Sequence, residues 1–152
     1  MRTYPFWLRA AAVVQIATAI IHSTSFFVSP EPANETERQM LDLLQNHKLD
    51  LGAGFHPAMA DLMTGLSMCF TLLYLLGAII AFYLLRKRVE AGVMKGLVNI
   101  YLAIFGVAFL WMALFTFLPP IVLTGLVFVL LTVARIMPFN SSETDTGGST
   151  VS

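Results

Sequence analysis

Four long apolar segments, separated by polar ones, dominate the pattern along the chain. They cover residues 6–28, 58–85, 94–118 and 121–137. Each is close to the roughly 20 residues that a helix needs to cross a bilayer. None shows the alternation of a transmembrane strand, and a backbone in lipid must satisfy its own hydrogen bonds, which favours helices. The pattern predicts an all-α fold class, a polytopic membrane four-helix bundle formed by residues 1–137.

The polar segment 29–57 is the largest piece outside the predicted spans. Its opening, SPEPA, is typical of an extended chain, and NETERQMLDLLQNHKL follows with apolar residues at helical spacing. Asn34, with Glu37 three residues later, matches a capping box. We expect a short amphipathic helix whose apolar face lies on the membrane surface or over the mouth of the bundle.

The sequence makes a separate prediction for each end of the chain, a retained first span and a disordered tail. MRTYPFWLR and the apolar run after it look like the start of a signal peptide, but HSTSFF has no clear small-x-small cleavage site. We therefore expect the first span to be retained. The polar and unpatterned residues 138–152 predict a disordered tail.

Composition supports a membrane protein. Hydrophobic residues make up 57% of the chain and charged residues 12%, whereas soluble domains have about 25% charged residues. The net charge is zero, which gives no indication of a nucleic-acid partner. The lone cysteine, Cys69, has no partner in the chain for a disulfide.

Lysine and arginine predict the orientation of the spans. Seven lie at the N-terminus, between the second and third spans, or at the end of the fourth, and two lie in residues 29–57. By the positive-inside rule, both termini are cytoplasmic and residues 29–57 lie on the outer side.

The histidine in AIIHSTSFF is out of place in a plain membrane anchor. On a helix, His22 lies on one line with Gln15, Ala19 and Phe26, next to small residues, while the opposite side is mainly apolar. This small and polar stripe is expected to face protein, because small residues allow close helix approach and glutamine or histidine can bond across the gap. We likewise expect Asn99 in the third span to form a hydrogen bond between helices.

Asp61 begins a polar stripe near the outer end of the second span. If the first two spans pack antiparallel, Asp61 and His22 reach a similar depth and could pair. A charge within a span costs at least about 2.5–3.5 kcal/mol, so the two residues are candidates for a ligand or proton-handling site. The alternative is structural: His22 joins two helices, and Asp61 serves as an N-terminal residue favoured by the helix dipole.

Metal and haem are further alternatives. His22, His47 and His56 all fall in the outer half with several acids, and histidine and carboxylate suit zinc or iron. His56 borders the second span, and histidines on two spans could bind haem axially. No HxxxH, HExxH or CxxC spacing is present, so no motif requires a cofactor.

AIIHSTSFF, the polar outer loop and the span opening HPAMADLMTGLSM together resemble small bacterial four-helix membrane proteins, loosely of the DoxX type. The resemblance covers residues 6–137. It implies a four-helix bundle associated with redox or respiratory membrane systems, and it carries over no catalytic residue.

Two functions follow from these features. The chain lacks a Gly-x-Ser-x-Gly, P-loop or dinucleotide motif, which favours a protein that is not an enzyme. Catalysis within the bundle would have to depend on His22 and Asp61 alone. We expect an integral membrane protein surrounded by the lipid bilayer that acts as an accessory or scaffolding subunit of a larger complex, or as a homo-oligomer. The alternative is a bundle that binds a quinone, haem, lipid or metal under the outer loop, with the tentative site residues His22, Asp61, Gln15 and His56.

Overall fold

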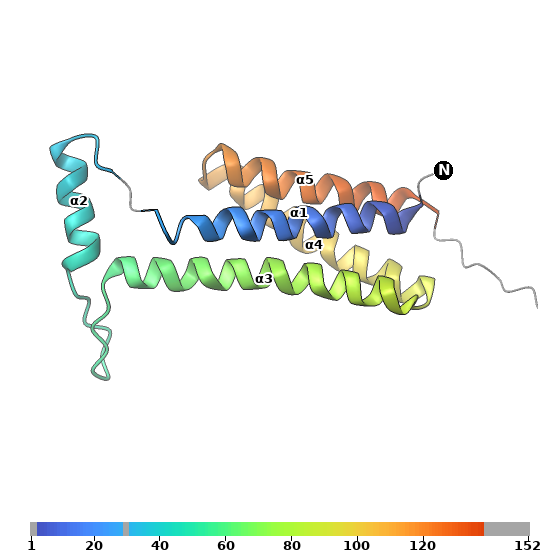
Figure 1. Ribbon diagram of the computed structural model, residues 1–152, viewed down its shortest axis with the longest axis horizontal. Helices are drawn as coiled ribbons and strands as arrows, with labels where there is room; N and C mark the ends of the chain where they lie inside the picture. Colours follow the sequence, from blue (N-terminus) through green and yellow to red (C-terminus); the bar gives the residue numbers. More distant parts are fainter. Residues whose placement is uncertain (1–2, 29–30, 139–152) are drawn as a thin grey trace, which may run out of the picture. The chain divides into compact units, whose positions relative to one another are not determined.

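The computed structural model describes residues 3–28 and 31–138. These residues form five α-helices, shown in Figure 1: α1 (Tyr4–Thr24), α2 (Glu35–Asn46), α3 (Met59–Lys87), α4 (Ala91–Phe115) and α5 (Leu118–Ile136). All except α2 are long and apolar enough to cross a membrane. The predicted all-α class, with four apolar helices and a short helix after the first, is confirmed, and it indicates an integral membrane protein. Of the predicted tail, only Pro138 lies within the described residues.

The chain divides into two compact units, each described here by itself. The first unit comprises the described parts of Met1–Ala11 and Ala81–Ser152, and so contains the start of α1, the end of α3, and α4 and α5. The second unit, Ala12–Ile80, contains the rest of α1, α2 and most of α3.

In the first unit, α4 and α5 form a tightly packed helical hairpin. Their buried residues recur every three or four positions: Met94, Val98, Tyr101 and Phe105 on α4, and Thr124, Val127, Leu131 and Ala134 on α5. The predicted third and fourth spans, 94–118 and 121–137, left Pro119 and Pro120 in a connection between them, but the structure places both prolines in the first turn of α5. Proline is tolerated there because the first helical N–H groups have no partner within the helix.

Two glycines let α4 and α5 approach closely. A Cβ atom at Gly125 would lie 2.8 Å from Cε2 of Phe109, and one at Gly106 would lie 3.2 Å from Cε2 of Phe128. The rings of Phe109 and Phe128 are stacked, with centroids 6.1 Å apart. Each aromatic ring therefore occupies the space that a larger residue would need on the facing helix.

The end of α3 has an unusual backbone. The Arg88 N–H donates to the Leu85 carbonyl, the Val89 N–H donates to the Leu84 carbonyl, and Arg88 has φ = 49°. Glycine is the usual residue at this left-handed position of a helix C-terminus. A residue with a Cβ adopts this conformation at a cost of roughly 1–2 kcal/mol.

In the second unit, α1 and α3 lie side by side and run in opposite directions, and α2 lies beyond the end of α1 (Figure 1). The first span was predicted to reach residue 28, but α1 ends at Thr24. The hydroxyl groups of Ser23, Thr24 and Ser25 donate to carbonyl groups three or four residues earlier. Such bonds offer the backbone an alternative to continuing the helix.

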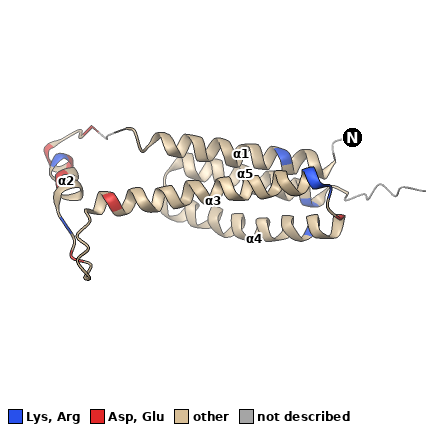
Figure 2. Ribbon diagram, turned by 60° about the horizontal axis from the view of Figure 1, so that its bottom comes forward, with Lys and Arg blue, Asp and Glu red and all other residues tan. Residues whose placement is uncertain are grey.

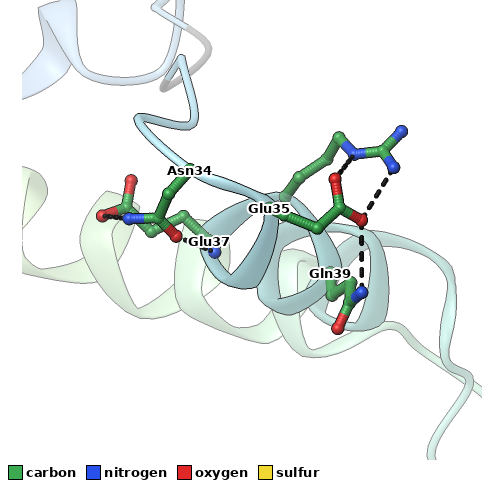
Figure 3. Close-up of polar contacts among 5 residues, drawn as sticks. Asn34, Glu35, Glu37 and Gln39 are labelled. Atoms are coloured by element: carbon green, nitrogen blue, oxygen red, sulfur yellow. Dashed lines mark hydrogen bonds and ion pairs between the residues drawn. The ribbon is translucent and has the colours of Figure 1, made fainter.

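Asn34 caps α2 as predicted. Its Oδ1 accepts a hydrogen bond from the Glu37 N–H at 2.9 Å (Figure 3). Oε2 of Glu37 accepts one from the Ala33 N–H at 2.8 Å. The reciprocal bond thus comes from the residue before the cap. The helix ends at Asn46, so His47 is its C-cap, although the segment predicted to be helical, NETERQMLDLLQNHKL, includes it.

A short hairpin joins α2 to α3. Lys48 pairs with Ala58 as an antiparallel bridge, and the Leu49 N–H donates to the Pro57 carbonyl at 2.9 Å. Three consecutive residues at the tip, Gly52 to Gly54, have positive φ, which explains the two glycines there. The hairpin places Lys48 next to the start of α3.

Candidate functional site

His22 lies in an aromatic setting on α1. Its ring contacts Phe70 of α3 edge to face, with centroids 4.9 Å apart, and Phe26 with centroids 6.0 Å apart. The residue is half-buried, and its buried Nε2 atom has no hydrogen-bond partner among the described residues. Nε2 of His22 is therefore available to donate a hydrogen bond to a ligand or to accept one from it, because no described residue already bonds to it.

The structure does not bring Asp61 to His22. Phe70, which contacts His22, lies nine residues beyond Asp61 on α3, or about 13 Å along the helix. The expected similar depth fails because α3 extends further than α1 at this end. Oδ2 of Asp61 instead accepts a hydrogen bond from the Ala58 N–H at 2.8 Å and lies 3.8 Å from Nζ of Lys48.

Asp61 thus acts as a helix-capping residue. Its side chain is 63% exposed and lies in the first turn of α3, where a carboxylate is favoured by the helix dipole. This matches the structural alternative that the sequence left open for this residue. The structure offers no support for Asp61 as a partner of His22.

The polar stripe predicted on α1 is buried over its first part, whereas His22 and Phe26 farther along it are half-buried. Ala11, Gln15, Thr18 and Ala19 are all at most 4% exposed, whereas Val13 and Ile20 on other sides are more than half exposed. Thr18 donates to the Val14 carbonyl of its own helix at 2.8 Å. The stripe therefore faces protein, as expected.

Gln15 is the most unusual member of this stripe. It is 0% exposed, and neither its Nε2 nor its Oε1 atom has a hydrogen-bond partner in residues 3–28 and 31–138. It lies seven residues before His22, on the same face of α1 and about 10 Å away along the axis. A buried polar group left without a partner costs about 1–3 kcal/mol.

Thr71 on α3 was not predicted as a site residue. It is 5% exposed, and its Oγ1 atom has no partner within the described residues. Threonine is common in membrane helices and usually bonds to its own backbone, so the sequence carried no signal for it. Its hydroxyl is a third unsatisfied group on the two facing helices of the second unit.

A groove of about 300 Å³ opens beside Thr71. It is lined by Ala19, Ile20, Ser23, Thr24 and Phe27 of α1 and by Thr71 and Leu75 of α3. The hydroxyls of Ser23 and Thr24 donate to carbonyls of their own helix. The Thr71 hydroxyl is therefore the lining group available to a molecule that enters this mainly apolar groove.

The histidines do not gather around a metal. His56 lies on the exposed hairpin, with Nδ1 3.9 Å from Oδ1 of Asp50, and His47 ends α2. Over the described ranges, no group of three or more histidine, cysteine, aspartate or glutamate residues could hold a metal ion. The aromatic rings in contact with His22 are those of phenylalanines, so the structure gives no second axial ligand for haem there.

The candidate site therefore consists of Gln15, His22 and Thr71 on two facing helices. These groups can form hydrogen bonds, and the groove that Thr71 lines can accept apolar groups. Gln15 and His22 do not line this groove. No protein-family model, no curated protein and no solved structure matches this chain.

Proposed function

We propose that this integral membrane protein binds a lipid-soluble molecule with a hydrogen-bonding group, such as a quinone or a lipid, between α1 and α3. The fully buried Gln15 amide, with both polar atoms unsatisfied within the described residues, carries this proposal. A residue that only joined two helices would bond across them. Within residues 3–28 and 31–138, the Gln15 amide, Nε2 of His22 and Oγ1 of Thr71 make no such bond.

The three side chains suggest what the ligand offers. The Gln15 amide provides a donor and an acceptor, the Thr71 hydroxyl provides both, and Nε2 of His22 provides either. Because Gln15 and His22 are about 10 Å apart along α1, carbonyl or hydroxyl groups at separate positions of an otherwise apolar molecule would be needed to satisfy them. Ligand sites combine apolar walls with a few polar groups of this kind. The groove beside Thr71 supplies such walls through Ala19, Phe27 and Leu75.

The test is to identify what copurifies with the full chain. The protein is extracted in mild detergent and examined by native mass spectrometry, and bound small molecules are recovered by solvent extraction. We expect a lipid-soluble molecule that is lost in Gln15→Leu and in His22→Ala. Thr64→Val is the matched control, because Thr64 is exposed on α3 and donates to its own helix at the Ala60 carbonyl. Retention of the same molecule by both site variants would overturn the proposal.

A second candidate function is that of an accessory subunit or homo-oligomer. Gly92 and Gly96 lie four residues apart on exposed positions of α4, and a Cβ atom at Gly96 would meet no atom within 4 Å. Small residues at this spacing favour close helix association in membranes. Large apolar residues on the same helix are exposed over its length, including Ile100, Ile104, Val107 and Leu114. The DoxX-type resemblance, with its link to respiratory systems, stays a prediction.

This candidate predicts association that depends on α4. Two differently tagged copies of the full chain are coexpressed and one is captured in mild detergent, and the captured material is also examined for other polypeptides. Gly96→Leu should abolish capture of the partner. Gly65→Leu is the control, because Gly65 on α3 is also exposed and open. Equal capture by both variants would exclude α4 as the contact.

We further propose that both termini are cytoplasmic and that residues 29–57 lie outside, as the seven-to-two distribution of basic residues supports. In a Cys69→Ser background, Ala33→Cys should react with an impermeant maleimide in intact cells. Glu90→Cys in the α3–α4 turn should react only after permeabilisation. The reverse pattern would invert the topology.

A further inference from the structure

The first unit contains a cavity of about 490 Å³ at one end of its helices. Its walls come from the start of α1, the end of α3, the start of α4 and the residue after the C-cap of α5: Thr3, Tyr4, Pro5, Arg9, Leu85, Arg88, Val89, Glu90, Ala91, Met94 and Pro138. The lining is therefore part charged and part apolar. Because these helices are candidate spans, their ends lie near a membrane surface.

Two unpaired arginines give the cavity its charge. Arg9 and Arg88 make no hydrogen bond or ion pair through their side chains with any residue in the described ranges. Glu90 is the carboxylate in the lining. Other lysines and arginines gather at the same ends of the first unit, on α3, α4 and α5 (Figure 2). The potential in the cavity is therefore positive, and a guanidinium without a partner is available to an anion.

The starts of two helices and the ends of two others meet at this cavity. Tyr4 and Pro5 at the start of α1 and Ala91 at the start of α4 all line the cavity. The N-cap of α4, Glu90, makes no side-chain hydrogen bond to the helix. The first N–H groups of α4 are thus donors available to an anion. The dipole ends give no net preference, because the C-terminal ends of α3 and α5 reach the same cavity at Val89 and Pro138, so the arginines supply the positive charge.

Arg88 also occupies a backbone position where glycine is the usual residue. Its φ of 49° lies in the left-handed region, at the point where α3 ends. Strained backbone positions cluster at ligand-binding and other functional sites. The guanidinium of Arg88, which lines the cavity, is a direct candidate for contact with a ligand there.

We propose that this cavity binds the phosphate group of an anionic phospholipid. Arg9 and Arg88 contact the phosphate oxygens, and the apolar walls formed by Leu85, Val89 and Met94 contact the glycerol and the start of the acyl chains. Basic pockets between membrane helices are suited to such headgroups. A soluble phosphate has the same charged group but would leave the apolar walls uncovered, so the lipid is the better fit.

The test uses the full chain, delipidated in detergent and titrated with phosphatidylglycerol or phosphatidylcholine under native mass spectrometry. We expect phosphatidylglycerol to bind about tenfold more tightly. Arg9→Gln and Arg88→Gln should each weaken it about fivefold, the factor that corresponds to one cationic contact at a membrane surface. Arg86→Gln is the matched control, since Arg86 is a neighbouring basic residue outside the lining, and should change binding less than twofold.

Two further variants separate binding from folding. Arg88→Gly removes the guanidinium and also relieves the backbone, so it should weaken lipid binding without lowering the melting temperature. Glu90→Gln removes the nearby negative charge and should strengthen binding of phosphatidylglycerol. Equal binding of the two lipids, or an equal loss in Arg86→Gln and Arg88→Gln, would overturn the proposal. Displacement of the lipid by an equal concentration of inorganic phosphate would assign the cavity to a soluble phosphate instead.

Discussion

Nε of Arg135 donates a hydrogen bond to Oδ1 of Asn99 at 2.6 Å, and this bond joins α5 to α4 across 36 positions of the chain. Arg135 lies in the last turn of α5, where a cation is favoured by the helix dipole. The expectation that Asn99 bonds between helices is confirmed. The bond fixes the register of the α4–α5 hairpin at the end opposite its connecting turn.

We expect Asn99→Leu to lower the free energy of unfolding by roughly 1 kcal/mol, because the charged donor of Arg135 loses its partner. Thermal unfolding of the full chain in detergent measures this. Thr132→Val is the control on α5, since Thr132 donates to its own helix at the Phe128 carbonyl. A loss no larger than that of the control would show that the bond contributes nothing to stability.

Gly125 and Gly96 should respond oppositely to the same substitution. Gly125→Ala places a Cβ 2.8 Å from Phe109, whose ring is held by stacking on Phe128, and should destabilise the protein by about 1–3 kcal/mol. Gly96→Ala meets no atom within 4 Å and should be neutral or stabilise α4 by up to about 1 kcal/mol. Unfolding in detergent distinguishes them, and similar effects of both would contradict the close packing of α5 on Phe109.

The capping role of Asp61 makes a third prediction. Asp61→Ala should cost about 0.5–2 kcal/mol, because the Ala58 N–H loses its acceptor at the start of α3. Lys48→Ala should cost less, since its ion pair with Asp61 is exposed and long at 3.8 Å. Hydrogen exchange of the first turn of α3 reports both effects. If Lys48→Ala destabilised this turn more than Asp61→Ala, the ion pair rather than the capping bond would explain the contribution of Asp61.

The start of α2 should depend on pH. Hydrogen bonds from Arg38 and then Gln39 lower the pKa of Glu35 below its ordinary value of 4.5 (Figure 3). A carboxylate with a lowered pKa in the folded state stabilises that state above its unfolded pKa, and this contribution is lost as the pH falls through the lowered pKa. Amide exchange protection in α2 should therefore decrease on acidification below about pH 4.5.

Arg38→Gln is the matched variant for this pH dependence. It should return the pKa of Glu35 toward its ordinary value, because the largest cause of the lowering is removed. Carbon-13 NMR of the Glu35 carboxyl measures the pKa directly. An unchanged pKa in the variant would show that the Arg38 pair is not formed in solution.

The ends of the predicted spans show how far the pattern alone could reach. Apolar runs located all four long helices, because lipid-facing residues need no partner in the chain and only have to be apolar. The ends were less certain, since LPP begins α5 and HSTSFF closes α1 at Thr24. A terminus depends on which local hydrogen bonds form, and several are compatible with the same composition.

The residues of the candidate site were likewise only partly predictable from the sequence. The stripe with Gln15 and His22 was visible, because small and polar residues at helical spacing stand out against lipid-facing ones. Nothing in the pattern indicated Thr71. The sequence allowed Asp61 to lie at the depth of His22, whereas the structure places it about 13 Å along α3 from the residue that contacts His22. Arg9 and Arg88 looked like ordinary orientation signals, since nothing in the spacing shows that both line one cavity.

The sequence by itself determined the fold class, the four candidate spans and the capping of α2, because each depends on short-range periodicity or on residues three positions apart. Only the tertiary structure decided that His22 meets Phe70 and that Asp61 bonds to Ala58. It also decided that Arg9 and Arg88 share a cavity. These relationships depend on the length and register of helices far apart in the chain, and a shift of one helical turn, about 5.4 Å, exchanges every facing residue.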